Sequence, residues 1–95
     1  MAKFTARVEL HDADGEDYEE LHGYMKQQGF ARYIVDRAGA KWQLPAAEYN
    51  IASTGEKSDV LAKAETAAKQ TGKKYMVLVT RSNGRTWANL PKWKG

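Results

Sequence analysis

The stretch Lys3-Phe4-Thr5-Ala6-Arg7-Val8-Glu9-Leu10 alternates polar and apolar side chains without a break. A period of two is typical of a β-strand with one buried face, because successive side chains point to opposite sides of a sheet. The four apolar residues of this stretch predict the core face of the sheet. Its polar residues are predicted to lie on the opposite face of the sheet. A strand of this kind needs neighbouring strands and a covering layer, which the rest of the chain must supply.

Two helices are predicted to form that covering layer. The first spans about 16–28, where Asp14 is placed to cap its start and Gly29 to end it in a left-handed conformation. The second spans about 56–71 and ends at Gly72. Its small apolar residues have helical spacing, so we expect it to lie close to the sheet.

Further strands are predicted over 30–36 and 41–44, joined by a turn, with pairing resuming over 48–51 after Pro45 interrupts the second strand. Residues 74–81 form another predicted strand. Its centre is apolar on both faces, so we expect helices to cover one face and another layer to cover the other.

The C-terminal end carries a strong turn signal. Asn83-Gly84 is typical of a two-residue hairpin turn, because both residues tolerate a positive φ. It predicts a short return strand over 85–88. Residues 89–95 are then expected to be a flexible tail.

The order of these elements is β-α-β-β-α-β with a short addition. It predicts an α+β, ferredoxin-like sandwich with a four-stranded antiparallel sheet, two helices on one face and a short C-terminal fifth strand. Ninety-five residues are expected to form a single domain over 1–95.

Composition limits the classes of function. The chain has no cysteine, no apolar run long enough to span a membrane, and no apolar stretch of signal-peptide length at its start. We therefore expect a cytoplasmic bacterial or phage protein without a membrane partner. No phosphate-binding loop or nucleophile motif is present, and we expect neither a cofactor nor a metal.

Charge is distributed unevenly along the chain. Residues 1–65 hold 8 Lys or Arg and 12 Asp or Glu, whereas residues 66–95 hold 7 basic residues and no acidic one. Basic side chains interleaved with aromatic ones suit single-stranded nucleic acid, since cations meet phosphates and rings stack on bases. The alternative is a strand edge and tail that use lysine to prevent edge pairing. The candidate contact residues are Arg7, Lys74, Arg81, Arg85 and Trp87.

His11, with Asp12 beside it, is the candidate for catalysis. A metal-independent ribonuclease needs a general base and a general acid, and histidine is the residue type whose unperturbed pKa lies near neutrality, so His11 and His22 are the two residues to consider. The alternative is an exposed His11 and a His22 at the edge of a helix face. Asp12 and Asp14 do not match a calcium loop, and helix capping explains the acidic cluster.

Several motifs together resemble the GhoS-like family of small bacterial proteins, which includes type V antitoxins. They are residues 4–11, Phe30 with Asp36, residues 43–49, and Gly84-Arg85-Thr86-Trp87. The resemblance implies a ferredoxin-like fold similar to small CRISPR-associated nucleases. For the antitoxin branch it implies endoribonuclease cleavage of a toxin messenger RNA. The basic C-terminus differs from the acidic-aromatic end of that branch, and no catalytic residue is carried over.

Two functional hypotheses follow. The first is an RNA-directed protein acting on single-stranded mRNA, with catalysis as an open question. The second is a non-enzymatic interaction module or homodimer, motivated by the two-faced apolar strand at 74–81 and by Trp42, Trp87 and Trp93.

Overall fold

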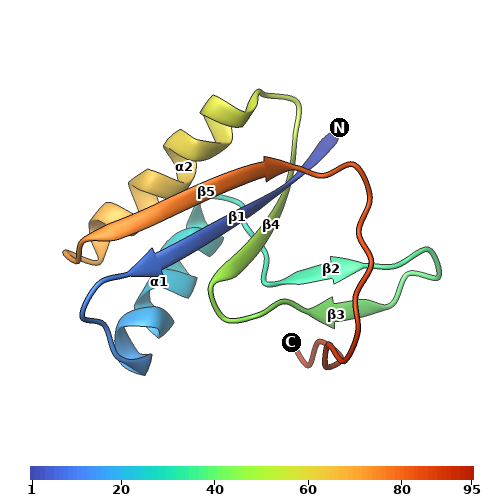
Figure 1. The fold of residues 1–95 in the computed structure, drawn as a ribbon, viewed down its shortest axis with the longest axis horizontal. Helices are drawn as coiled ribbons and strands as arrows, with labels where there is room; N and C mark the ends of the chain where they lie inside the picture. Colours follow the sequence, from blue (N-terminus) through green and yellow to red (C-terminus); the bar gives the residue numbers. More distant parts are fainter.

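Strand β1 (Ala2–Leu10) is the middle strand of a three-stranded antiparallel sheet, flanked by β4 (Glu48–Ser53) and β5 (Tyr75–Arg81). The computed structural model describes residues 1–95 and is a mixed α+β structure, as predicted (Figure 1). The predicted alternation of β1 is confirmed, because Phe4, Ala6 and Val8 are buried while Lys3 and Arg7 are exposed.

Helices α1 (Gly15–Gln27) and α2 (Lys57–Gln70) lie on the same face of this sheet (Figure 1). The start of α1 is a reciprocal cap in which Asp14 and Asp17 each accept the other's backbone N–H at 3.0 Å. The bond from the Asp17 N–H is the main reason why the pKa of Asp14 is lowered. Gly29 and Gly72 follow the two helices with φ values of +94° and +74°, so both predicted helix ends are confirmed.

The core fills the space between the sheet and the helices. It is a cluster of 12 buried residues, which includes Phe4 and Val8 from β1 and Tyr49 from β4. Three alanines of α2 are completely buried: Ala64, Ala67 and Ala68. Their small side chains bring the helix close to the sheet, as the sequence predicted.

A separate hairpin of β2 (Tyr33–Val35) and β3 (Lys41–Gln43) projects beyond the main sheet (Figure 1). The predicted strand over 30–36 is therefore divided. Ala31 pairs with Asn50 of β4 through two backbone hydrogen bonds of 2.8 Å, and the chain then turns away to pair with β3. The continuous four-stranded sheet is replaced by sheets of three and two strands, because Pro45 and the turn after it separate β3 from β4.

The predicted fifth strand and its Asn83-Gly84 hairpin are wrong. Residues 85–88 form no strand, and Asn83 does not adopt the positive φ that a type I′ turn requires. After Ser82, whose N–H donates to the Lys3 carbonyl, the chain leaves the edge of β5 and crosses toward the hairpin (Figure 1). Apolar contact competes with edge pairing here, because Trp87 packs against Trp42 of β3 with ring centroids 6.5 Å apart.

Residues 89–95, expected to be a flexible tail, hydrogen-bond with β3. Gln43 N–H donates to the Pro91 carbonyl at 2.8 Å, and Trp93 N–H donates to the Lys41 carbonyl at 3.1 Å. Two buried residues outside the main core, Ile34 and Leu44, line a small pocket together with Trp87 and Leu90. The C-terminal segment thus helps to hold the hairpin.

The face of the main sheet opposite the helices is open. Met76 and Leu78 of β5 point to this face and are 60% and 64% exposed. The second covering layer predicted for this strand is not supplied by the chain itself. Neither helix is long and apolar enough to cross a membrane.

Candidate functional site

A groove of about 460 Å³ lies between the main sheet and the β2–β3 hairpin. We call it the basic groove, because four of its twelve lining residues are cationic: Lys3, Arg37, Arg81 and Arg85. They come from the start of β1, the hairpin turn, the end of β5 and the segment that follows it. None of the four forms an ion pair within the chain, so their charges are available to an anion.

Arg85 is the most firmly positioned of these cations. Its Nη2 donates to Thr5 Oγ1 at 2.8 Å and to Asn50 Oδ1 at 3.0 Å, which fixes the side chain across the open face of β1 and β4. Burial lowers the pKa of Arg85, and Glu48 acts in the opposite direction. Arginine nevertheless stays protonated in proteins. A partly buried cation whose only hydrogen-bond partners are neutral favours the approach of an anion.

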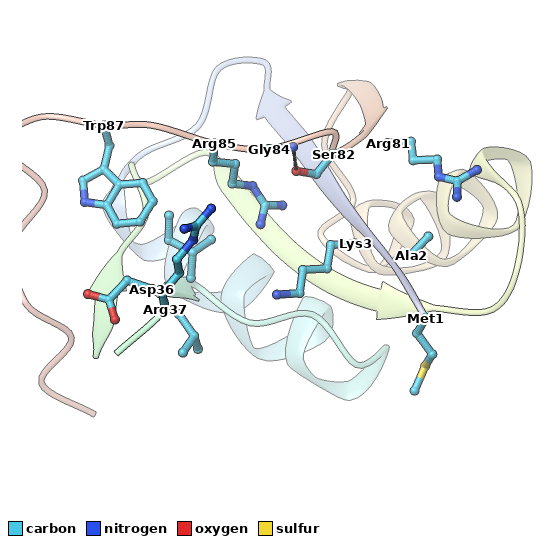
Figure 2. A pocket seen from close by; sticks show the side chains of 12 residues that line it. Met1, Ala2, Lys3, Asp36, Arg37, Arg81, Ser82, Gly84, Arg85 and Trp87 are labelled. Carbon is cyan, nitrogen blue, oxygen red and sulfur yellow. Dashed lines mark hydrogen bonds between the residues drawn. The ribbon is translucent and has the colours of Figure 1, made fainter. Parts of the chain in front are cut away.

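The other cations differ in orientation. Figure 2 shows the side chains of Arg85, Arg37 and Lys3 directed toward a common space, whereas Arg81 extends away from it. Three cationic groups on three separate elements therefore converge. Arg37 belongs to the turn of the hairpin and Lys3 to β1, so the space between them depends on how the hairpin is held against the sheet.

Asp36 is the single acidic residue of the groove, and its carboxylate is already engaged. It accepts the Trp42 Nε1–H at 3.0 Å and the backbone N–H groups of Ala38 and Ala40 at 2.9 Å. The bond from Trp42, followed by those from the backbone, lowers the pKa of Asp36. The carboxylate thus shapes the hairpin turn and does not bind the cations as an ion pair.

Exposed apolar side chains border the cations. Trp87 is 36% exposed and Val35 is 44% exposed, and both line the groove. One side of the Trp87 ring is supported by Trp42, which leaves the indole held in place and still accessible. A supported aromatic ring beside cations is the combination that binds a base next to its phosphate.

The residues predicted to contact nucleic acid are only partly brought together. Arg81, Arg85 and Trp87 line the groove. Arg7 lies on the open face and pairs with Glu9 and Glu48, at 3.5 Å in each case. Lys74 precedes β5 at its other end, about 23 Å from Arg81 at the rise of an extended strand.

The catalytic candidates lie away from the groove. His11 and Asp12 are exposed and share a shallow depression with Lys74, without side-chain hydrogen bonds between them. His22 does not meet His11 but contacts Tyr49, with 2.5 Å between Nδ1 and the hydroxyl oxygen. No group of three or more His, Asp or Glu side chains is arranged to hold a metal ion.

Lys3 and Arg37 are the groove residues that sequence reasoning missed. Both belong to the acidic first two thirds of the chain, so a charge count by segment hides them. Lys3 could have been placed on the polar face of the sheet, because residues 3–10 alternate polar and apolar side chains. No known family model matches the chain, and neither does any curated protein.

Proposed function

We propose that this protein binds single-stranded RNA in the basic groove. The observation that carries the proposal is the convergence of Arg85, Arg37 and Lys3 beside the exposed ring of Trp87. The cations contact consecutive phosphates, and Trp87 stacks against one base. Stacking needs an unpaired base, which favours a single strand over a duplex.

The resemblance to the GhoS-like family supports the same substrate class. It also motivates a finer description of the fold, which we propose as a ferredoxin-like arrangement whose fourth strand is reduced to the Ala31–Asn50 bridge. Cleavage of the bound RNA is the further step that the family resemblance suggests. The groove contains no histidine, so we propose that this site binds RNA and do not assign cleavage to it.

Binding to a fluorescent single-stranded RNA tests the proposal. We expect binding at low salt and a linear fall of log K with log salt, with a slope of about −2 for three phosphate contacts. A blunt-ended duplex of the same composition should bind more weakly, since its paired bases cannot stack on Trp87. The lack of any binding at low salt, or an equal affinity for the duplex, would contradict the proposal. Gel electrophoresis of the same RNA after incubation with the protein, with and without magnesium, measures cleavage separately.

A second candidate function is self-association through β5. This strand is at the edge of the sheet, and Met76 and Leu78 stand exposed on its open face. Unpaired edges of this kind accept another strand. Antiparallel pairing of two copies about the middle of β5 would place Leu78 beside its own copy and form an isologous interface.

Sedimentation equilibrium tests whether the protein self-associates through β5. A dimer is expected to dissociate when Leu78→Lys places a charge at its centre, because two like charges would meet directly across the axis. Thr66→Lys is the control, since it adds the same charge at an exposed position of α2. A wild-type protein that stays monomeric at its highest soluble concentration would exclude the dimer.

A further inference from the structure

A second cavity, of about 610 Å³, lies between α1 and the residues that lead into β2, and it shares no lining residue with the basic groove. Its lining includes one acidic side chain, Glu19, and three basic ones, His22, Lys26 and Arg32. Tyr33 and Trp93 form an aromatic wall, with their ring centroids 5.1 Å apart. The cavity therefore combines three nitrogen-bearing side chains with an apolar surface.

Arg32 has a buried donor that is not used within the chain. Its Nε is the only buried side-chain nitrogen or oxygen without a hydrogen-bond partner. Leaving a buried N–H of a charged group without an acceptor costs more free energy than leaving a neutral one. Arg32 lines the cavity, so an acceptor bound there lies beside this guanidinium group.

His22 supplies a second donor, because Tyr49 fixes its tautomer. Tyr49 is fully buried, and burial raises the pKa of its hydroxyl, which therefore keeps its proton. The one acceptor that this hydroxyl meets is His22 Nδ1. Burial, together with the charge of Arg32, lowers the pKa of His22, so the ring is neutral near pH 7. Its proton then resides on Nε2, which has no partner within the chain and can donate.

We propose that this cavity binds a phosphate group through Arg32, Lys26 and the Nε2–H of His22. All three groups donate hydrogen bonds, and a phosphate offers several acceptor oxygens to meet them. Among the charged side chains of the cavity, the two cations Lys26 and Arg32 outnumber the single carboxylate of Glu19. The Tyr33–Trp93 wall suits a ring attached to the phosphate. The shared ligand chemistry is thus a phosphate group, either free or part of a mononucleotide.

Titration with inorganic phosphate, followed by NMR of the Arg32 Nε–H and the His22 ring, tests this site. We expect saturable shifts of both resonances. Arg32→Lys should weaken binding, read from the His22 ring, by about tenfold, because it keeps the charge and removes the Nε–H. Arg7→Lys, the same change at an exposed position outside both cavities, should leave the phosphate affinity read from the His22 ring unchanged. A parallel titration with a nucleoside monophosphate assigns the source, since tighter binding supports a nucleotide and equal binding supports free phosphate.

Shifts that do not saturate, or an unchanged affinity in Arg32→Lys, would overturn the site. If Arg32→Lys does not fold, Lys26→Gln at an exposed position of α1 replaces it, and unchanged phosphate binding in that variant also overturns the site. The site is independent of the proposed RNA function. Loss of RNA binding in Arg85→Ala and loss of phosphate binding at the His22 ring in Arg32→Lys are separate measurements, so the two proposals can fail separately.

Discussion

Arg85→Ala is expected to weaken the binding of single-stranded RNA by about 10- to 100-fold. This range follows from the free energy of a hydrogen bond to a charged group, about 1.5–3 kcal/mol, and a factor of ten for every 1.4 kcal/mol. Arg85 should dominate the groove because Thr5 and Asn50 already hold its side chain in place. Little conformational entropy is then lost when a phosphate binds. Fluorescence anisotropy at constant salt measures the change.

Lys94→Ala is the matched charge control for this measurement. Lys94 belongs to the same basic third of the chain but is exposed and lies outside the groove. Its removal should change affinity only slightly, whereas Arg85→Ala should also reduce the steepness of the salt dependence by about 0.7. Equal effects of the two substitutions would mean that net charge, and not the groove, attracts the RNA.

Phe4→Ala is expected to lower the free energy of unfolding by about 3–5 kcal/mol. Phe4 is 1% exposed and belongs to the central strand, so its removal leaves a cavity between the sheet and the helices. Small domains have a total stability of about 5–15 kcal/mol, and the variant should therefore melt at least about 10 °C lower. Urea unfolding followed by circular dichroism gives the value.

Met76→Ala is the control for the core substitution, measured at a concentration at which the chain is monomeric. Met76 is on the same sheet but 60% exposed on the open face. Its truncation should change the free energy of unfolding by no more than about 0.5 kcal/mol. A large loss of stability in this variant would show that Met76 packs against other residues of the same chain, and a small loss for Phe4→Ala would place the core elsewhere.

Local patterns predicted most of the fold. The alternation of residues 3–10 identified the central strand, and Asp14, Gly29 and Gly72 marked where helices begin and end. Each of these signals acts over a few residues, through side-chain direction or backbone conformation. They are therefore visible in the sequence alone.

The errors arose where distant residues decide the outcome. Asn83-Gly84 has a strong local preference for a hairpin, but Arg85 binds Thr5 and Asn50, which are 80 and 35 positions away in the chain. Separation along the chain also explains why only part of the candidate site was predicted. Charge counting along the chain found Arg81 and Arg85, whereas Lys3 and Arg37 join them only through the tertiary structure. From the sequence, His22 and His11 are a possible acid and base pair, but in the structure His22 contacts Tyr49 of β4.

The groove draws its cations from positions 3, 37 and 85, which lie in three separate parts of the chain. A fragment that contains all three must span at least residues 3–85, so a ligand that contacts all three recognises the folded domain and not a short segment of it. By thermodynamic linkage, such a ligand raises the melting temperature in proportion to the logarithm of its concentration once the groove is saturated. The same linkage makes occupancy of the groove a measure of folding, including the segment after β5 that carries Arg85.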